Sequence, residues 1–452
     1  MPRPRPAPRE LNLFDATMLV MGGIVGVGIF FNPGQVARLV PNVPAFLVMW
    51  GIGGGIALCA AFTFAELGAT FPRAGGWFVY LRECHGRAVA FLFAWVVLLV
   101  ITTGALAVMA NFCVGALEGI VPGVAPADTL ARRLEEAGLL LLISALALCG
   151  VKVGALFQNA CMLIKLGAIA ALVVAGFVLF SPAEVSTILP TSAAPQPDAP
   201  PLWRGMILAT LPVLFSCGGW QMLGYAAGFV KDARRTIPLA IVLGVCGVIV
   251  VYLALNSAYV RVVGLEHMAA DDQFAAEVAR RAIGSWGESA LRVAMAISAV
   301  GVITVNVIVS PWVYVAMARE GLFFERFGRL HPRTGAPTLA LGLQAAFALG
   351  YVFLGDPDFL VSSVVFVEWI FHALVAYGLL ILCLRRPGLA RPFASPRVFP
   401  LLYLVMATCI VLGNLWQNEA RLTLTGLGLI GAGAIAYPLW RRLVARRVPR
   451  AR

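Results

Sequence analysis

The sequence predicts an all-α protein that crosses a membrane many times, and three observations support this fold class. Of its 452 residues, 60% are hydrophobic and only 12% are charged, and the mean hydropathy is +0.89. A soluble domain of this size needs far more charge to cover its surface. Apolar runs of 18 or more residues recur from one end of the chain to the other, which is typical of helices that span a bilayer.

Twelve such runs are predicted to be membrane-spanning helices. In chain order they cover residues 14–39, 44–70, 88–119, 138–153, 157–181, 204–229, 236–262, 288–318, 337–354, 359–384, 398–417 and 421–441. The longest loops between them are 182–203 and 263–287, and the second has the pattern of a short amphipathic helix. No stretch between the runs is long enough for a soluble catalytic or nucleotide-binding domain, so the sequence predicts a protein that is not an enzyme.

The positive charges are distributed unevenly along the chain. The net charge of +12 suggests nucleic acid as a partner, but most of the 34 Lys and Arg residues fall on the N-terminal side of the predicted spans. This bias predicts a multi-pass protein of the cytoplasmic (plasma or inner) membrane with both termini in the cytoplasm, and no nucleic-acid partner. The tail 1–12 is rich in Pro and Arg and is predicted to be disordered, without a cleavage site. The nine cysteines are scattered, and no metal or cofactor is expected.

Two of the predicted spans are interrupted by glycines. The first contains "GGIVGVGIF" and the sixth contains "LPVLFSCGGWQMLGY". Matching broken helices in two halves of a chain point to a transporter built from inverted repeats, with its binding site at the breaks. We therefore expect repeats at 13–181 (helices 1–5) and 204–384 (helices 6–10), joined by an external loop, 182–203. Residues 385–452 then hold helices 11 and 12 and a basic cytoplasmic tail.

Several stretches resemble the amino acid–polyamine–organocation superfamily, and within it the L-amino acid transporter branch. They are "GGIVGVGIF", "FAELGATFPRAGGWFVYLRECHGR", "FSCGGWQMLGYAAGFVKDARRTIPLA", "VAMAREGLFFERFGRLHPRTGAPTLA" and, more weakly, "WIFHALVAYGLLILCLRRPGLARPF". The resemblance implies a leucine-transporter-type fold with five-plus-five inverted repeats, unwound helices 1 and 6, and transport of amino acids or related amines. The chain departs from the family pattern at Trp77, Gly228, Phe229 and Trp312, where relatives carry Glu or Arg.

The first interruption offers partners for a carboxylate. An amino acid is a zwitterion, and burying it in a membrane is costly unless both charges are met. The N-terminal end of the outer half-helix favours an anion, and Gly26, Val27 and Gly28 can supply the amides. The resemblance assigns the carboxylate donors to Val27 and Gly28 and an amine-accepting carbonyl to Ile24. The alternative is that the small residues serve close helix packing.

The second interruption offers carbonyl oxygens for an ammonium group. They belong to Phe215, Ser216 and Gly218. The resemblance also assigns Phe215 as the gating aromatic that covers the substrate from outside. The nearby Trp220 is interpreted as a core packing residue.

Lys165 lies eight residues into the fifth predicted span. An intramembrane lysine is costly and usually functional. The resemblance places its ammonium where sodium-coupled relatives hold an ion, against the carbonyls of the first break, which predicts sodium-independent transport. Whether the lysine titrates and couples transport to protons, or stays charged, is left open. The alternative role is a lysine that snorkels to the cytoplasmic face.

Glu368 and His372 are four residues apart on one face of the tenth span. Three interpretations stay open for them: a carboxylate in the pocket that meets a cationic substrate side chain, a structural pair, and a proton relay. Elsewhere, Glu66 is a candidate for a cytoplasmic salt-bridge gate with Arg73, Arg82 and Arg87, or these arginines form a basic face at the lipid headgroups. Asn111 in the third span is interpreted as facing either the pocket or a packed neighbouring helix.

The leading functional prediction is a secondary active transporter, either a permease or an exchanger, that moves amino acids by alternating access. No phosphate-binding loop of the GxxxxGK[ST] type is present, which argues against an ATP-driven pump. Transport of cationic amino acids, polyamines or other amines through Glu368 is the first alternative. A channel or a transporter-like sensor is the alternative from a different class. The expected partners are the small-molecule substrate and the bilayer, and the sequence does not identify a partner subunit.

Overall fold

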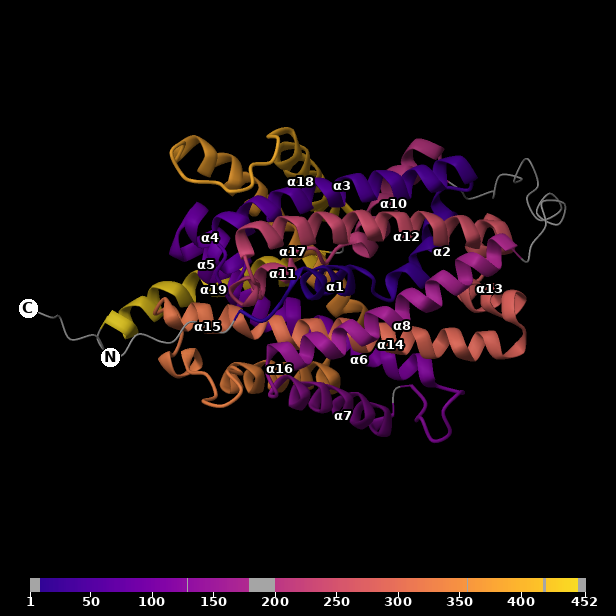
Figure 1. The fold of residues 1–452 in the computed structure, drawn as a ribbon, viewed down its shortest axis with the longest axis horizontal. Helices are drawn as coiled ribbons and strands as arrows, with labels where there is room; N and C mark the ends of the chain where they lie inside the picture. Colours follow the sequence, from indigo (N-terminus) through magenta and orange to yellow (C-terminus); the bar gives the residue numbers. More distant parts are fainter. Residues whose placement is uncertain (1–8, 128, 179–199, 356, 418–419, 446–452) are drawn as a thin grey trace, which may run out of the picture.

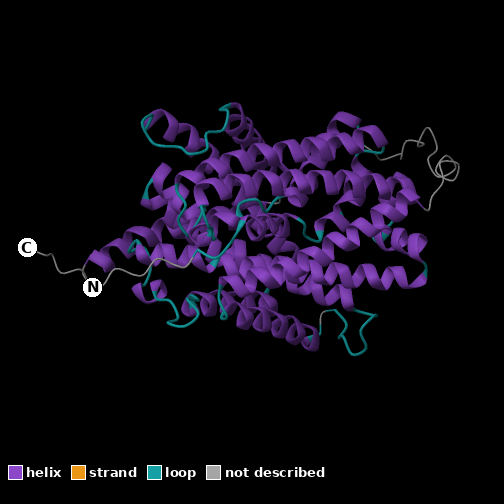
Figure 2. Cartoon of the chain, in the orientation of Figure 1, coloured by secondary structure: helices purple, strands orange, loops and turns teal. Residues whose placement is uncertain are grey.

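The chain is described by a computed structural model in which residues 9–127, 129–178, 200–355, 357–417 and 420–445 are placed. The expected disordered tail and the loop 182–203 therefore lie largely outside the described residues. Figure 2 shows helices joined by loops and turns, and the described residues contain no strand beyond one isolated bridge between Leu11 and Val230. The predicted all-α class is confirmed for this part of the chain.

The helices follow one another along the whole chain (Figure 1). The first part contains α1 (Leu13–Ile24), η1 (Gly28–Phe30), α2 (Asn32–Leu39), α3 (Val43–Thr70), α4 (Trp77–His85), α5 (Arg87–Val96), η2 (Val97–Ile101), α6 (Thr102–Leu117), α7 (Leu130–Ala147) and α8 (Val151–Val178). The second part contains α10 (Leu202–Cys217), α11 (Met222–Tyr225), η3 (Ala227–Phe229), α12 (Ala233–Ala270), α13 (Phe274–Ile283), α14 (Ser285–Val309), α15 (Pro311–Arg319), η4 (Glu325–Gly328), α16 (Thr338–Leu354), α17 (Pro357–Arg385), α18 (Val398–Gln417) and α19 (Ala420–Ala445).

Within the described residues, nine helices are long and apolar enough to cross a membrane. Two shorter apolar helices, α1 and α16, accompany them. The predicted fourth span falls on α7, which carries charged residues in its first half. The chain is therefore a multi-pass membrane protein with several apolar helices.

The boundaries of α7 and α8 differ from the predicted spans 138–153 and 157–181. Helix α7 begins at Leu130, and α8 begins at Val151. The hydropathy pattern missed the start of α7 because Arg132 and Glu136 are charged, yet both are buried and lie 3.2 Å apart (Nε to Oε1). Pairing offsets part of the cost of burying each charge, so this charged turn can pack inside the bundle.

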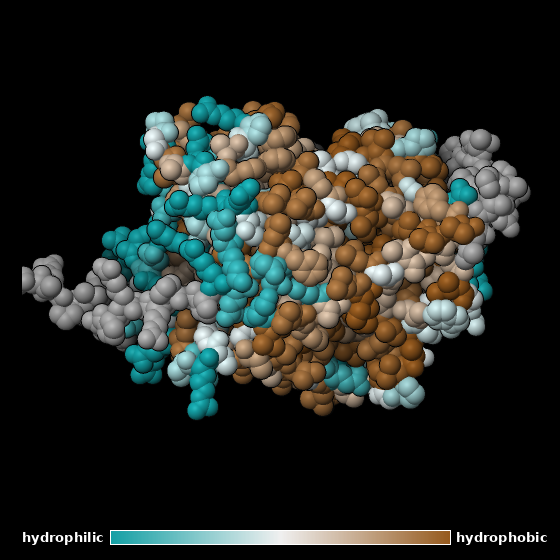
Figure 3. Space-filling model, viewed as in Figure 1, coloured by the Kyte–Doolittle hydropathy of each residue, from teal (hydrophilic) through white to brown (hydrophobic). Residues whose placement is uncertain are grey.

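Hydrophobic residues cover the middle of the face drawn in Figure 3, and hydrophilic residues gather toward the end that carries α4 and α15. We call this end of the bundle the α4 end and the opposite end the α13 end. Helix α12 runs between them and bends at Gly264, where φ is +77°. The expected amphipathic helix of 263–287 is present as α13.

The two broken segments lie at the centre of the bundle. Helix α1 stops at Ile24 and packs against α8, α12 and α14, while α10 stops at Cys217 and packs against α2 and α3. Figure 1 shows α1 and α11 in the interior, between α12 on one side and α14 on the other. Both helix ends therefore point into the middle of the membrane-spanning part.

Candidate functional site

A cavity of about 170 Å³ lies between the two helix breaks. All eight residues that the sequence predicted for substrate binding line it: Ile24, Gly26, Val27, Gly28, Phe215, Ser216, Gly218 and Glu368. Side chains from α6, α14 and α17 complete the wall. The structure thus brings together residues that are separated by more than 300 positions in the chain, and we call this space the central cavity.

The first break leaves two backbone donors without partners. The Gly26 amide donates to the Ile24 carbonyl oxygen over 2.8 Å, which closes a tight turn after α1. In the described part of the chain, the amides of Val27 and Gly28 have no backbone hydrogen-bond partner. Both residues line the central cavity, so these amides are available to an anionic group there.

The first break contains four glycines: Gly22, Gly23, Gly26 and Gly28. None of them has a positive φ, so unusual backbone angles do not explain their presence. The role of three of them is to let other groups approach the backbone closely. A Cβ on Gly28 would lie 3.0 Å from Asn32 Nδ2 and 3.1 Å from Ser216 Oγ. These two atoms are themselves hydrogen-bonded at 2.7 Å. A Cβ on Gly26 would meet only ordinary contacts. Gly28 is therefore tightly enclosed, and so are Gly22, where a Cβ would lie 1.8 Å from Gln158 Nε2, and Gly23, where it would lie 3.0 Å from the Gly219 carbonyl oxygen.

The second break, at residues 218–221, depends on Gly219. Its φ of +122° is a conformation that side chains disfavour, and a Cβ there would lie 2.2 Å from the carbonyl oxygen of Gly23. The Gly219 amide donates to Gln221 Oε1 over 3.1 Å. The backbones of the two breaks therefore touch, and Gly219 is the point of contact.

Tyr252 on α12 joins the two breaks, a role that no sequence motif predicted. Its hydroxyl lies 3.1 Å from the Ile24 carbonyl oxygen and 3.0 Å from the Ser216 carbonyl oxygen. The side chain is almost fully buried. The Tyr252 hydroxyl proton is thus shared between one carbonyl oxygen of each break. The Ile24 oxygen also accepts a hydrogen bond from the Gly26 amide.

Lys165 reaches the first break from α8. Its Nζ donates to the Val25 carbonyl oxygen, and the residue is 1% exposed. The side chain therefore points into the protein and does not snorkel in this structure. A charge-assisted bond of this kind compensates an orphaned carbonyl at a helix end.

Glu368 faces the central cavity from α17. Gln221 of the second break donates to Glu368 Oε1 over 3.1 Å, and His372 Nε2 lies 3.9 Å from the same oxygen. His372 Nδ1 is hydrogen-bonded to the Tyr403 hydroxyl, and the Trp77 ring packs edge-on against the imidazole at 4.5 Å. Gln221 is a partner that sequence reasoning missed, because a lone glutamine after a glycine pair carries no motif.

The two aromatic residues of the second break differ in exposure. Phe215 is 45% exposed and lines the central cavity. Trp220 is fully buried, and its ring centre lies 5.9 Å from that of His372. The packing interpretation of Trp220 agrees with this placement, although the residue also contributes to the cavity wall.

Glu66 does not pair with the arginines of its own loop. It accepts hydrogen bonds from Arg391 Nη1 at 3.0 Å and from the amide and hydroxyl of Ser395 at 2.9 and 2.7 Å. Arg82 instead pairs with Glu83 and Glu320. The ion pair of Glu66 with Arg391 is thus separate from the group formed by Arg82, Glu83, Glu320 and Arg386. The contact at Glu66 holds the segment between α17 and α18 against α3.

Asn111 does not line the central cavity. Its Nδ2 donates to Glu136 Oε1 over 2.9 Å, and the residue lines a different cavity near the α13 end. Within the described residues, no three His, Cys, Asp or Glu side chains are grouped so that they could hold a metal ion. The residues that line the central cavity offer hydrogen bonding and, through Glu368, charge complementarity.

Comparisons with known proteins agree with this geometry. The family model "Amino acid permease" matches residues 11–429. The chain is 27% identical over 433 residues to the human large neutral amino acids transporter small subunit 2, covering 95% of this chain and 80% of the relative. It is 28% identical over 403 residues to the mouse Asc-type amino acid transporter 1, covering 88% and 74%. It is 25% identical over 450 residues to the mouse b(0,+)-type amino acid transporter 1, covering 97% and 91%.

The match spans the two helix breaks, Lys165 and Glu368, so it includes every part of the candidate site. The resemblance that the sequence motifs suggested is confirmed. The chain belongs to the amino acid permease family of the amino acid–polyamine–organocation superfamily, whose members are membrane transporters and not enzymes.

Proposed function

We propose that the protein is a secondary active transporter that moves neutral amino acids with apolar side chains by alternating access. The observation that carries this proposal is the central cavity itself, which is lined on one side by free amide donors and on the other by a helix C-terminus. The name of the human relative, which specifies large neutral amino acids, supports leucine as the first substrate to test.

In this proposal the two charges of the substrate bind to different breaks. The carboxylate accepts from the amides of Val27 and Gly28. The ammonium donates to carbonyl oxygens at the end of α10, where Phe215 and Gly218 line the cavity. The Ile24 carbonyl oxygen is the further acceptor that the sequence offered for the amine; it accepts from the Gly26 amide and shares the Tyr252 hydroxyl proton with the Ser216 carbonyl.

Lys165 makes the proposed transport independent of sodium. Its Nζ donates to the Val25 carbonyl oxygen, so this oxygen of the first break has a partner without a bound ion. The same group is the candidate for coupling transport to protons.

The proposed topology has twelve spans with both termini in the cytoplasm of a plasma or inner membrane. The first repeat covers 13–181 and the second 204–384, and helices 11 and 12 follow. The α4 end is then cytoplasmic and the α13 end external. Arg82 on α4 and Arg319 on α15 are basic residues at this end and support the orientation.

Uptake of labelled L-leucine into proteoliposomes tests the proposal. We expect saturable uptake that accelerates when unlabelled leucine is placed inside and that persists when choline replaces sodium. Val27→Ser should retain binding because the amide remains, whereas Gly28→Val should abolish it because its side chain displaces the Asn32–Ser216 contact. Non-saturating, ohmic current would instead support a channel, and loss of uptake in choline would reject the role of Lys165.

A cationic amino acid or amine is the second candidate substrate, and the position of Glu368 favours it. The carboxylate faces the central cavity and has an uncharged partner in Gln221. A lysine or polyamine ammonium placed there gains a charge-assisted hydrogen bond. If arginine or lysine competes with labelled leucine at lower concentration than unlabelled leucine does, this candidate replaces the first.

A further inference from the structure

An aromatic cluster joins the start of η4 to the last turns of α19. The ring centre of Trp440 lies 4.6 Å from that of Phe324, edge to face, and 6.0 Å from that of Phe323. Phe327 packs on Phe323 at 4.8 Å. None of these side chains lines the central cavity, so the cluster is separate from the proposed transport site.

The position of Trp440 in its helix places the cluster at the level of the lipid headgroups. Helix α19 contains one of the candidate membrane spans, and its apolar stretch ends at Trp440, directly before Arg441 and Arg442. A tryptophan followed by arginines at the end of a span is typical of the boundary between hydrocarbon and water. Because Phe324 packs on Trp440, the start of η4 lies at this boundary as well.

Part of this region faces outward and is apolar. Phe324 is 49% exposed, and Leu439, the neighbour of Trp440 in the chain, is 54% exposed. In water such exposure is unfavourable, but at the membrane boundary these side chains contact lipid. Phe324 and Leu439 therefore form an apolar surface that suits the upper part of an acyl chain.

Three arginines flank the apolar surface: Arg326 of η4, and Arg441 and Arg442 of α19. Phe324 and Phe327 are three residues apart, one turn of a 3₁₀ helix, so they share a face and Arg326 lies beside it. All three arginines are exposed, and among the described residues none of their guanidinium groups has a hydrogen bond or an ion pair. The acidic residue of η4, Glu325, is also exposed, so three positive charges stand beside one negative charge.

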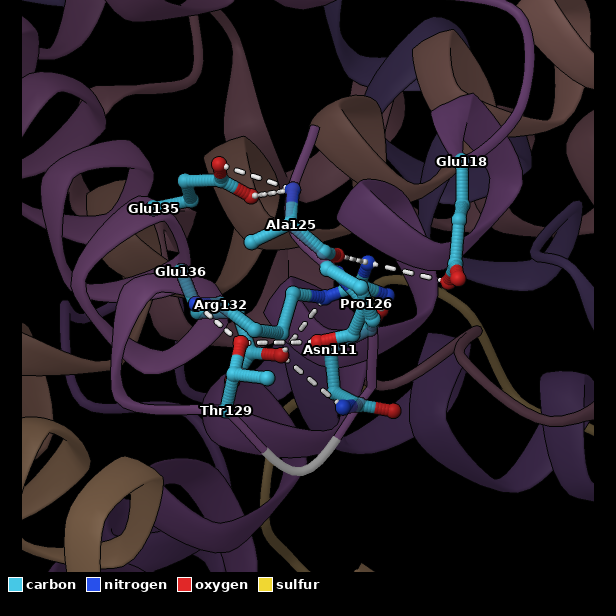
Figure 4. Close-up of polar contacts among 8 residues, drawn as sticks. All are labelled: Asn111, Glu118, Ala125, Pro126, Thr129, Arg132, Glu135 and Glu136. Atoms are coloured by element: carbon cyan, nitrogen blue, oxygen red, sulfur yellow. Dashed lines mark hydrogen bonds and ion pairs between the residues drawn. The ribbon is translucent and has the colours of Figure 1, made fainter. Parts of the chain in front are cut away.

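Arg132 of α7 shows the contrasting case of an arginine that the fold satisfies internally (Figure 4). Its guanidinium group pairs with Glu118 and Glu136 and donates to the carbonyl oxygens of Asn111 and Ala125. The three arginines beside the aromatic cluster have no such partners in the described part of the chain. Their N–H groups are available to an external anion, and the guanidinium fork matches a phosphate group in particular.

We propose that this region is a binding site for an anionic phospholipid of the leaflet at the α4 end. We call it the η4 patch, and it consists of Phe323, Phe324, Phe327, Leu439 and Trp440 together with Arg326, Arg441 and Arg442. The lipid phosphate pairs with the arginines, and an acyl chain begins on Phe324 and Leu439.

The charge of the η4 patch selects for an anionic headgroup. A zwitterionic lipid carries the same phosphate, but its positive group meets repulsion from the same arginines, so the anionic lipid binds more tightly. The bound lipid connects η4, which belongs to the proposed second repeat, with α19, which follows both repeats. This inference requires only that the chain crosses a membrane, and it does not depend on the transported substrate.

Native mass spectrometry of the full chain in detergent tests the inference, with dioleoylphosphatidylglycerol as the anionic lipid and dioleoylphosphatidylcholine as the zwitterionic lipid with the same chains. We expect the wild-type chain to bind its first phosphatidylglycerol about tenfold more tightly than its first phosphatidylcholine. Arg326→Gln combined with Arg441→Gln should remove this preference. Arg234→Gln combined with Arg235→Gln is the matched control. It removes two charges at exposed positions of the α4 end, outside the η4 patch, and should keep the preference.

Equal loss of the preference in the two double variants would mean that the whole α4 end attracts anionic lipid, and it would overturn the site. Equal binding of both lipids to the wild-type chain would overturn it as well. Phe324→Ala leaves every arginine in place and removes apolar surface, so it should weaken phosphatidylglycerol binding. Unchanged binding in this variant, or displacement of the lipid by inorganic phosphate, would show that the patch binds a phosphate group alone and is not a lipid site.

Discussion

The two helix breaks are built differently, although they face one cavity. At the first break, a buried cation holds the backbone: Lys165 donates to the Val25 carbonyl oxygen, and two amides remain free. At the second break, close packing and an uncharged side chain hold the backbone. Gly219 packs against Gly23, and the Gln221 side chain accepts a hydrogen bond from the Gly219 amide. The first break thus has a positive character and the second presents carbonyl oxygens, as a substrate with one charge of each sign requires.

This difference suggests that the two breaks fail in different ways when they are mutated. The second break tolerates no added volume at Gly219, so a substitution there should act on folding. The first break depends on one charge, so its substitutions should act on transport while the protein remains folded. Each prediction below tests one side of this comparison, from the largest expected effect to the smallest.

Gly219→Ala should destabilise the protein most. The alanine adopts a disfavoured φ, and its Cβ overlaps the Gly23 carbonyl oxygen, which together cost roughly 3 kcal/mol. We expect a lower thermal unfolding temperature and a smaller monodisperse fraction in detergent. Gly55→Ala is the matched control, because a Cβ at that helical position meets nothing within 4 Å and its unfolding temperature should not fall. Equal behaviour of the two variants would mean that the breaks do not touch.

Lys165→Met should abolish transport with a smaller effect on folding. The substitution keeps the length and apolar stem of the side chain but leaves the Val25 carbonyl without its charged partner, at a cost of about 1–3 kcal/mol. We expect leucine uptake into proteoliposomes to fall at least tenfold while the size-exclusion profile stays monodisperse. Uptake at the wild-type rate would show that the first break does not depend on this charge.

Glu368→Gln should change selectivity more than rate. The amide keeps the size of the side chain and removes the negative charge that faces the central cavity. Competition of lysine against labelled leucine should weaken about tenfold, because a charge-assisted hydrogen bond is replaced by a neutral one. The same competition profile in both proteins would remove Glu368 from the pocket and favour its role as a structural partner of Gln221 and His372.

Tyr252→Phe should have the smallest effect. It removes the hydroxyl that the Ile24 and Ser216 carbonyls share, which is worth about 1 kcal/mol. We expect a small decrease in unfolding temperature and at most a few-fold weaker leucine binding, measured by thermal shift. A loss as large as that of Lys165→Met would mean that the hydroxyl, and not the cation, organises the first break.

Much of this architecture could be predicted from the sequence because long apolar runs and paired glycine interruptions are local signals. The predicted span 44–70 is observed as α3, Val43–Thr70, and the residues expected at both breaks line one cavity. The start of α7 could not be predicted, because the mutual burial of Arg132 and Glu136 is a tertiary property.

The side chains that connect the parts of the site also could not be predicted from the sequence. Tyr252 and Gln221 act through hydrogen bonds to backbone and carboxylate groups that only the fold brings near. Glu66 has its partner, Arg391, far along the chain, so its own loop gave the wrong candidates. At the first break, Gly28 is needed for space, whereas Gly26 has only ordinary contacts, and only the fold distinguishes the two.

A structure of the protein with bound L-leucine tests the central claim most directly. We expect the leucine carboxylate within hydrogen-bonding distance of the Val27 and Gly28 amides, and the ammonium against the carbonyls of Phe215 and Gly218. The opposite orientation, with the ammonium at the first break, would contradict the account, as would leucine bound away from the central cavity in a fully occupied complex.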